Sequence, residues 1–295
     1  MRDGGRNTIW WRSGRSGAPS SRPLVIVGTG AVATAFADAC VRRGITARLL
    51  PDRALDLSDE WQLARLLAAA SPWALVAAPS CLGVEDAEQD PASCLYDDTR
   101  HIIAIASACE AASVRVATFS TDLVFDGRAA EPYVETSDAV PLSVYGRGKA
   151  TIESLLRMLA PDALVIRPGA VFGVRDDDLV GRGLWSLALH EPFLAADDLV
   201  ISPTYLPDLA DATLDLLIDN EFGVWHVAND GVATWAELVE ATAKAAGVGR
   251  RTLVRAPHEE LGWAAPRPAY SALRSGRGVL LPSLHDAVGR YAHGL

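Results

Sequence analysis

Short apolar runs alternate with helical segments from Pro23 onward, and this alternation limits the chain to a small set of folds. The run Leu24–Val27 ends in glycine, as a buried strand often does, and a helix is predicted next over Ala31–Arg43. Further strands are predicted at 46–50, 74–78, 114–119 and 163–167, and further helices at 60–70, about 97–112 and 143–159. Strands that alternate with helices form βαβ units. The sequence therefore predicts an α/β fold with a doubly wound, parallel sheet.

Beyond Gly173 the alternation weakens. Helices are expected at 183–190, 206–218 and 234–246, a strand at 223–228 and a loop at 176–178; Thr234 and Glu237 fit a capping box at the last of these helices. We therefore expect residues 23–173 to form a Rossmann domain. Residues 174–295 are expected to form mainly a smaller C-terminal lobe, with some segments returning to the sheet.

The first 22 residues have a different composition from the rest of the chain. They hold five arginines with several serines and glycines, and they lack the apolar segment of a secretory signal. We expect a disordered N-terminal extension over residues 1–22; a targeting or partner-binding arm is the alternative.

The turn after the first strand carries a nucleotide-binding pattern. Residues 28–33 read G-T-G-A-V-A and fit G-x-G-x-x-G/A, directly after a strand and at the opening of a helix. In this pattern Gly28 allows the tight turn, Gly30 lets the backbone approach a pyrophosphate, and Ala33 lets the helix pack closely on the strand. The N-terminus of the helix then faces the anion. We interpret this turn as a dinucleotide-binding site.

The residues after the second strand leave the choice of cofactor open. An acid such as Asp52 would bind the adenosine ribose and favour NAD, whereas Arg53 would accept the 2′-phosphate of NADP. Asp56 has two equal interpretations, because it could cap the next helix or hydrogen-bond the adenine.

A tyrosine and one of the two lysines of the chain form the candidate catalytic pair. Tyr145 and Lys149 are four residues apart, so they share one face of a helix. The ammonium can lower the pKa of the phenol and prepare it to donate a proton near neutral pH. Some two dozen residues earlier, an apolar run ends on Ser120 and Thr121. These residues suggest a site that protonates a substrate oxygen.

Composition excludes few functions but argues against several. A formal net charge of −10 argues against a nucleic-acid partner, and no apolar run reaches the 18 residues of a membrane span. The six histidines show no metal-ligand spacing, so we expect no metal site. The four cysteines form no C-x-x-C pair and are interpreted as free thiols in a reducing compartment, the cytoplasm: Cys40, Cys81, Cys94 and Cys109.

Several motifs follow one another in a definite order. They are L-D-L-S-D (55–59), V-E-D-A-E (84–88), F-S-T-D-L-V-F-D-G (119–127), P-Y-V-E (132–135), Y-G-R-G-K (145–149), S-P-T-Y (202–205) with Asp208, and R-P-A-Y-S (267–271). In this order and spacing the chain resembles the dTDP-4-dehydrorhamnose reductase family, which belongs to the extended short-chain dehydrogenases/reductases. The resemblance runs from about Pro23 almost to the C-terminus. It implies NAD(P)H-dependent reduction of the 4-keto group of a nucleotide-linked 4-keto-6-deoxyhexose, with dTDP as the expected nucleotide, in deoxysugar biosynthesis.

The resemblance also implies roles for individual residues. Thr121 would hydrogen-bond the substrate carbonyl oxygen, Tyr145 would protonate that oxygen, and Lys149 would bind the nicotinamide ribose. NADPH or NADH would be held by Gly28, Gly30, Ala33, Arg53, Asp56, Leu57, Ala78, Tyr145 and Lys149. The nucleotide sugar would be held by Thr121, Asp122, Leu123, Ala170 and Arg267, with the C-terminal lobe binding the substrate. Some relatives carry a dimer-bridging metal ion, but no ligand set can be assigned here, and a homodimer remains an option.

Departures from the family pattern lie around the sugar rather than the catalytic residues. Two positions that are aromatic in the rhamnose enzymes are Leu123 and Ala170, while Leu82 replaces a threonine and Asp98 an asparagine. This pattern indicates a different deoxysugar or a loss of activity. Two alternatives stay open: a nucleotide-sugar epimerase or dehydratase of the same fold, and a non-catalytic, NADP-binding regulatory subunit. Dehydratases typically place an acid pair beside the active threonine, which disfavours that alternative because Asp122 is followed by Leu123.

Overall fold

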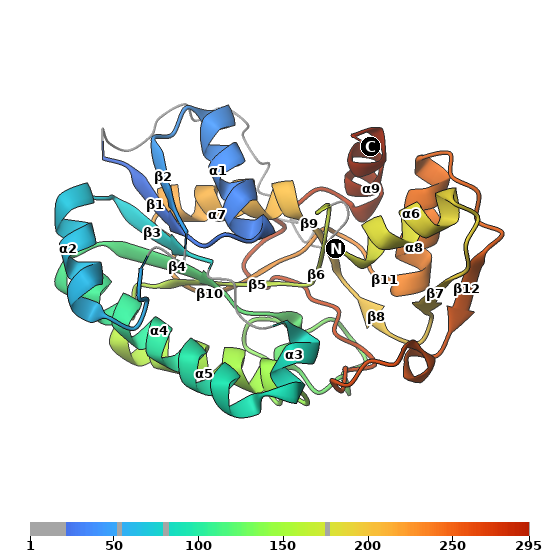
Figure 1. Cartoon of the computed structure of the whole chain (residues 1–295), viewed down its shortest axis with the longest axis horizontal. Coiled ribbons are helices and arrows are strands. Elements are labelled where there is room, and N and C mark those ends of the chain that lie inside the picture. Colours follow the sequence, from blue (N-terminus) through green and yellow to red (C-terminus); the bar gives the residue numbers. More distant parts are fainter. Residues whose placement is uncertain (1–21, 52–54, 79–82, 175–177, 295) are drawn as a thin grey trace, which may run out of the picture.

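A parallel sheet forms the centre of the protein. The computed structural model describes residues 22–51, 55–78, 83–174 and 178–294. Across these ranges six strands form the main sheet in the order β10-β5-β4-β3-β1-β2, and every neighbouring pair is parallel (Figure 1). The strands are β1 (Leu24–Val27), β2 (Ala47–Leu50), β3 (Ala74–Ala77), β4 (Arg115–Phe119), β5 (Leu164–Pro168) and β10 (Gly223–Val227). The predicted α/β fold is confirmed.

Both faces of the sheet are covered because successive side chains of a strand point to opposite faces. Leu24 and Ile26 of β1 join the core under α1 and α7, whereas Val25 and Val27 join the core under α2, α4 and α5. Figure 1 shows the two helical layers on either side of the sheet. These helices are α1 (Ala31–Arg43), α2 (Glu60–Ala70), α4 (Pro91–Ala111), α5 (Val144–Leu159) and α7 (Leu206–Ile218).

Local signals explain where several helices begin and end. α1 ends at Gly44, which adopts a left-handed φ of 66°. α2 begins after Asp59, whose side chain accepts hydrogen bonds from the backbone N–H groups of Trp61 (2.9 Å) and Gln62 (3.1 Å). The predicted start of α4 near residue 97 is wrong, because Asp90 caps this helix and Pro91 opens it. A short helix not predicted from the sequence, α3 (Val84–Gln89), precedes it.

The second half of the chain builds a smaller cluster beside the sheet. Helices α6 (Leu179–Ala188), α8 (Trp235–Ala245) and α9 (Leu284–His293) share a separate hydrophobic core. The predicted start of α6 at residue 183 is wrong, because Asp178 caps the helix by accepting from the N–H of Gly181 (2.7 Å). The predicted capping box of Thr234 and Glu237 is confirmed. Short strands pair as β6 (Ala170–Phe172) with β9 (Pro203–Tyr205), β7 (Phe193–Ala196) with β12 (Leu253–Ala256), and β8 (Val200–Ile201) with β11 (Ala233–Thr234).

The strand order contains a topological switch point. The chain runs from β1 outward to β2 and then crosses back to β3 on the other side of β1. The loops that leave the carboxyl ends of β1 and β3 therefore diverge, and ligands of open α/β sheets bind at such a switch point. Within the described ranges, no helix combines the length and apolarity needed to cross a membrane.

Candidate active site

The glycine turn after β1 is packed directly against the end of β3. Gly28 has a φ of +145°, and a Cβ atom at this position would lie 2.0 Å from the carbonyl oxygen of Ala78 and 3.2 Å from the Cβ of Ala33. Only glycine fits there. α1 then begins after Gly30 without a side-chain cap and without an acidic residue in its first turn. A turn of this shape and polarity suits a phosphate group, because the helix dipole and the first N–H groups favour an anion.

The segment that follows β2 is only partly described. Arg53 lies outside the described residues. Asp56 is exposed and accepts hydrogen bonds from the N–H (2.9 Å) and the hydroxyl (2.6 Å) of Ser58, which lower its pKa. Its interpretation as the helix cap is wrong, because Asp59 caps α2. The Leu57 side chain is buried in the core, so only its backbone can face a ligand.

A second close approach brings Thr121 to the beginning of α5. Thr121 precedes a single 3₁₀ turn, η2 (Asp122–Val124), and caps it by accepting from the N–H of Leu123 (3.2 Å). A Cβ atom at Gly146 would lie 2.2 Å from the carbonyl oxygen of Leu123. Because Gly146 has no side chain, the first turn of α5 can rest on η2. The catalytic candidates Thr121 and Tyr145 are thereby held on adjoining segments.

The first turn of α5 is also held by hydrogen bonds to its N-cap residue and to α3. Its N-cap Ser143 accepts from the N–H of Gly146 (3.0 Å), and Glu88 of α3 accepts from the N–H of Val144 (2.5 Å). Lys149 is buried, and its Nζ lies 5.4 Å from the centroid of the Tyr145 ring. The structure therefore places the predicted pair together, in a region where the backbone has little freedom to move.

The side chain of Asp122 does not reach the surface of the protein. It is buried and bonded to Thr121 and Ser271. Burial raises its pKa to about 6 against the opposing effect of hydrogen bonds from Ser271, Thr121 and nearby backbone N–H groups.

A buried charged network that the sequence did not predict lies behind Thr121. Glu153 of α5 accepts from the hydroxyl of Ser120 and forms a bidentate ion pair with Arg167 of β5 (2.7 and 2.6 Å). The side chains of Arg167 and Glu153 are 4% and 2% exposed, so the pair is almost dry. Arg167 also lies 3.2 Å from Nε2 of His226 on β10. Because arginine can only donate, this nitrogen accepts, and His226 is neutral.

The network continues into residues 262–283, which precede α9 and are called the C-terminal segment below. Nδ1 of His226 lies 3.1 Å from the carbonyl oxygen of Tyr133 and 3.2 Å from that of Arg274. Burial lowers the pKa of His226 to about 4, and the charge of Arg167 acts in the same direction. Glu135 accepts from the N–H of His226 (3.0 Å) and from Ser275 (2.6 Å). The strand ends of the sheet are thus joined to residues far along the chain.

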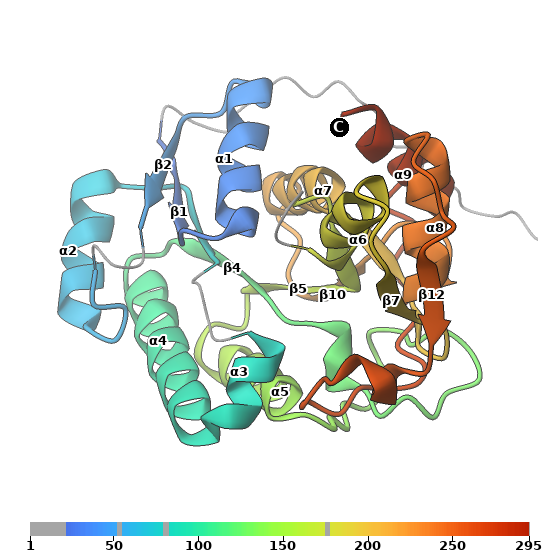
Figure 2. The ribbon, with the colours of Figure 1, turned by 45° about the vertical axis from the view of Figure 1, so that its right-hand side comes forward.

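Arg267 of the R-P-A-Y-S motif is held by the short helix α3. It donates to Glu85 (2.5 Å) and stacks on Trp263, with the guanidinium carbon 4.0 Å from the ring centroid. Glu85 also accepts from the N–H groups of Ala264 (2.6 Å) and Ala265 (3.1 Å). Burial raises the pKa of Glu85, but these hydrogen bonds and the Arg267 charge outweigh it and hold the pKa below its usual value. Figure 2 shows the C-terminal segment lying beside α3.

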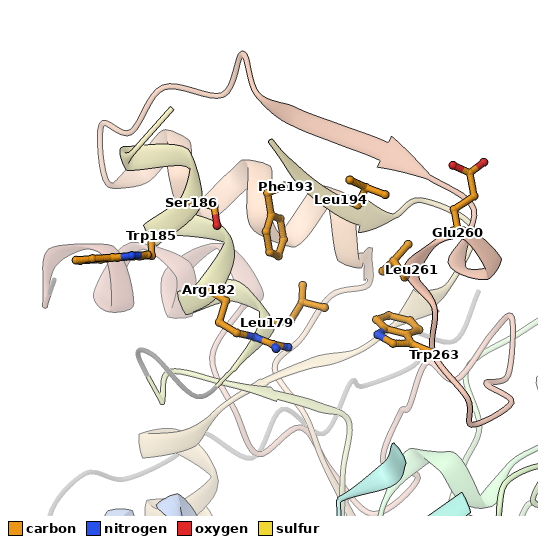
Figure 3. Close-up of a pocket in the computed structure, with 9 residues that line it drawn as sticks. All are labelled: Leu179, Arg182, Trp185, Ser186, Phe193, Leu194, Glu260, Leu261 and Trp263. Carbon is orange, nitrogen blue, oxygen red and sulfur yellow. The ribbon is translucent and has the colours of Figure 1, made fainter. Parts of the chain in front are cut away.

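A groove of about 560 Å³ lies next to this segment. It runs between α6, β7 and the 3₁₀ turn η4 (His258–Leu261), and its lining is largely apolar: Leu179, Arg182, Trp185, Ser186, Phe193, Leu194, Glu260, Leu261 and Trp263. In Figure 3 the side chains of Arg182 and Trp263 point toward one another across the groove, while the carboxylate of Glu260 points away. The sequence did not predict this groove, because no motif marks its residues.

Ala170, the last of the predicted substrate-binding residues, lies on the strand pair that leads into the lobe. It is half-buried and pairs with Pro203 through the backbone of β6 and β9. Its neighbour Gly169 packs directly on Ser202, since a Cβ atom at Gly169 would lie 1.8 Å from the Ser202 carbonyl oxygen. Leu82 lies outside the described residues.

The six-stranded parallel sheet, with helices on both faces and a switch point between β1 and β3, defines a doubly wound α/β protein of the Rossmann type. More particularly, the chain belongs to the dTDP-4-dehydrorhamnose reductase family, because the family described as RmlD substrate binding domain matches residues 22–279. The expected family is therefore confirmed.

Individual relatives have low sequence identity to this chain. The chain is 28% identical over 268 residues to a dTDP-4-dehydrorhamnose reductase of Streptomyces griseus, which covers 88% of this chain and 87% of that protein. It is 34% identical over 154 residues to the spore coat polysaccharide biosynthesis protein SpsK of Bacillus subtilis, covering 52% of this chain and 54% of that protein. Among solved structures, the dTDP-4-dehydrorhamnose reductase of Bacillus anthracis in complex with NADP has the same fold, with a TM-score of 0.87 and 21% identity over 93% of this chain and 99% of that one.

Replacing Gly146 by alanine should destabilise the protein, because the added Cβ would collide with the backbone of η2. Overpacking of this kind costs about 1–3 kcal/mol. Gly289→Ala is the matched control, since Gly289 lies within α9 and nothing lies within 4 Å of the added Cβ. We expect the control to stabilise the protein by up to ~1 kcal/mol. Urea unfolding of both variants measures the difference; equal shifts of the same sign would contradict the packing described for Gly146.

Removing one member of the buried ion pair should be more harmful than removing both. Arg167→Met leaves the carboxylate of Glu153 buried without its cation, which costs about 3–5 kcal/mol. Glu153→Leu combined with Arg167→Met removes both charges and should recover at least half of that loss. The free energy of unfolding of the single and double variants is the measurement. A double variant no more stable than Arg167→Met would show that the charge pair is not the source of the effect.

Proposed function

We propose that the protein is an NADPH- or NADH-dependent reductase of the 4-keto group of a nucleotide-linked, dTDP-type 4-keto-6-deoxyhexose. The observation that carries the proposal is the contact of Gly146 with η2, which holds Thr121 beside the turn of α5 that presents Tyr145. Membership of the dTDP-4-dehydrorhamnose reductase family supports the same substrate class. The proposed place of action is the cytoplasm, in deoxysugar biosynthesis.

In the proposed reaction Tyr145 donates its phenolic proton to the carbonyl oxygen that gains negative charge, and Thr121 donates a hydrogen bond to the same oxygen. The ammonium of Lys149 lies over the Tyr145 ring, where its charge stabilises the phenolate that remains. The buried backbone around these residues keeps the donors oriented before the substrate arrives, which lowers the cost of reaching the transition state.

The turn at the switch point suits a dinucleotide. Gly28 lets this turn pack against the carbonyl oxygen of Ala78, and among the described residues no side chain caps the first N–H groups of α1. In this proposal Gly28 and Gly30 hold the pyrophosphate, and the buried Ala33 lets α1 pack close to the turn. Arg53, Asp56 and the backbone of Leu57 contact the adenosine, and Ala78, Tyr145 and Lys149 line the nicotinamide side. The bound nicotinamide supplies the hydride. Residues 23–173 would hold the cofactor, and residues 174–295 would hold most of the substrate.

The groove beside Trp263 is the proposed site of the nucleotide part of the substrate. Its aromatic walls can stack on a base, and Arg182 and Arg267 supply positive charge for a diphosphate. Leu123 and Ala170 then lie toward the sugar, where their small or aliphatic side chains leave more room than the aromatic residues of the rhamnose enzymes. A deoxysugar other than the rhamnose precursor is therefore the proposed substrate.

Tyr145→Phe should remove the proton donor and lower kcat for ketosugar reduction by about 100- to 10,000-fold. Binding of NADPH, measured by fluorescence titration, should change little because the phenyl ring remains. Tyr96→Phe is the matched control, since Tyr96 is 61% exposed on α4. The assay follows NADPH and NADH oxidation with a panel of nucleotide-linked 4-ketosugars.

The outcomes separate the alternatives. Unchanged turnover in Tyr145→Phe would refute the proposed role. Conversion of the sugar without net oxidation of the cofactor would indicate an epimerase or dehydratase. Tight NADPH binding without oxidation across the panel would indicate a regulatory subunit.

Trp263→Ala should weaken binding of dTDP by about 10- to 100-fold, because stacking of a base on an aromatic side chain contributes about 1–3 kcal/mol. Trp61→Ala on α2 is the control, because Trp61 is 68% exposed and lies outside the groove. Isothermal titration of dTDP into both variants is the measurement. Equal affinities for the two variants would place the nucleotide elsewhere.

A further inference from the structure

The hydroxyl of Thr121 already has two partners in this structure. Its Oγ1 accepts from the N–H of Leu123 (3.2 Å) and donates to Oδ1 of Asp122 (3.1 Å). A hydroxyl has one proton and two lone pairs. Thr121 therefore cannot donate to a substrate oxygen while it donates to Asp122. Its donation to Asp122 has to end before it can donate to the substrate.

Asp122 is held from behind by a residue of the C-terminal segment. The hydroxyl of Ser271 donates to Oδ2 of Asp122 over 2.5 Å, and the two residues are 149 positions apart in the chain. Ser271 is 1% exposed, and its N–H donates to the carbonyl oxygen of Val200 (2.8 Å), so its position is fixed. Ser271 ends the R-P-A-Y-S motif, whose Arg267 stacks beside the groove.

We propose that Asp122 and Ser271 form a positioning pair that sets the direction in which Thr121 donates its proton. This inference rests on the proposed function, since it concerns the donor to the substrate carbonyl. In the competent arrangement Asp122 is neutral, its Oδ1–H donates to Oγ1 of Thr121, and Thr121 turns its own proton toward the substrate oxygen. Asp122 takes up one proton from solvent before the reaction and keeps it, so it transfers none to the substrate, and Ser271 donates to Oδ2 throughout.

The neutral form is the one that leaves no group without a partner. If Asp122 were ionised when Thr121 turned away, its buried carboxylate would lose one of its donors and keep only Ser271 and nearby backbone N–H groups, and the loss of a hydrogen bond by a buried charged acceptor is costly. Burial raises the pKa of Asp122 to about 6, which makes the neutral carboxyl accessible near neutral pH although the ionised form predominates at pH 7. The segment that carries Arg267 thereby contributes to the chemical step as well as to substrate binding.

A double-mutant cycle between Asp122 and Thr121 tests the pair. Asp122→Ala should lower kcat by about 30-fold, which is less than the 100- to 1,000-fold typical for the direct loss of an oxyanion donor. Asp122→Asn should recover at least one third of the parent kcat, because its amide N–H can donate to Thr121 and its oxygen can accept from Ser271. In a Thr121→Ala background, Asp122→Ala should have no further effect, because a residue that acts through another shows strong non-additivity. The KM for NADPH should stay within about twofold throughout.

Equal losses in both backgrounds, or no loss in either, would overturn the inference. If Asp122→Ala does not fold, Ser271→Ala takes its place in the cycle, with an expected loss of about 3- to 10-fold that also disappears in Thr121→Ala. Tyr145→Phe in the same assay separates this outcome from the parent proposal. Additive losses with an inactive Tyr145→Phe refute only the positioning pair, whereas an active Tyr145→Phe, or a parent that reduces no ketosugar, refutes the proposed function and this inference with it.

Discussion

Glu153 and Arg167 form an ion pair from which water is almost entirely excluded, and its position explains much of the remaining architecture. Glu153 lies on the helix that carries Tyr145, and Arg167 lies on β5, next to β4, whose end at Phe119 leads into Thr121. A buried pair is stable only when its remaining lone pairs and protons are bonded. Ser120 and His226 provide those bonds. The network therefore fixes α5, the end of β4, β5 and the edge strand β10 relative to one another, behind Thr121 and Tyr145.

The same network extends to segments that the sheet does not contain. His226 binds the carbonyl oxygens of Tyr133 and Arg274, and Glu135 binds both Ser275 and the N–H of Gly276. A loop after β4 and the C-terminal segment thus meet over the buried histidine. Both segments are thereby tied to the same buried network as the helix that carries Tyr145. Loops positioned on a rigid scaffold are the usual carriers of binding residues.

The sheet could be predicted from the sequence because each of its signals is local. Apolar runs of four or five residues predict the strands. Gly28 and Gly44 predict the turns before and after α1, and none of these signals depends on the rest of the chain. The start of α4 carried an equally local signal in Asp90 and Pro91, which the apolar pattern alone did not reveal. The strands of the lobe are different, since β6 to β9 have two to four residues each and are defined by distant partners. So short a segment has too few residues to show a period.

The candidate site also has a part that could be predicted from the sequence and a part that could not. Thr121, Tyr145 and Lys149 could be proposed from spacing and from family motifs, whereas their supports could not. Ser271 reaches Asp122 across 149 residues and Arg267 reaches Glu85 across 182, so no periodicity relates the partners. The motif V-E-D-A-E illustrates the limit: its letters indicate a family, but only the structure shows Glu85 binding the C-terminal segment and Glu88 binding the start of α5.

Several of these motif residues therefore link segments that are far apart in the sequence, whereas others contribute through their backbone. Leu123 serves the architecture through its backbone, with its N–H on Thr121 and its carbonyl against Gly146. Ala170 pairs with Pro203 through the backbone of β6 and β9. At both positions these contacts are made by the backbone. In the proposed mechanism, a change of side chain at Leu123 or Ala170 therefore alters the space offered to a sugar while Tyr145, Lys149 and the buried ion pair stay where they are.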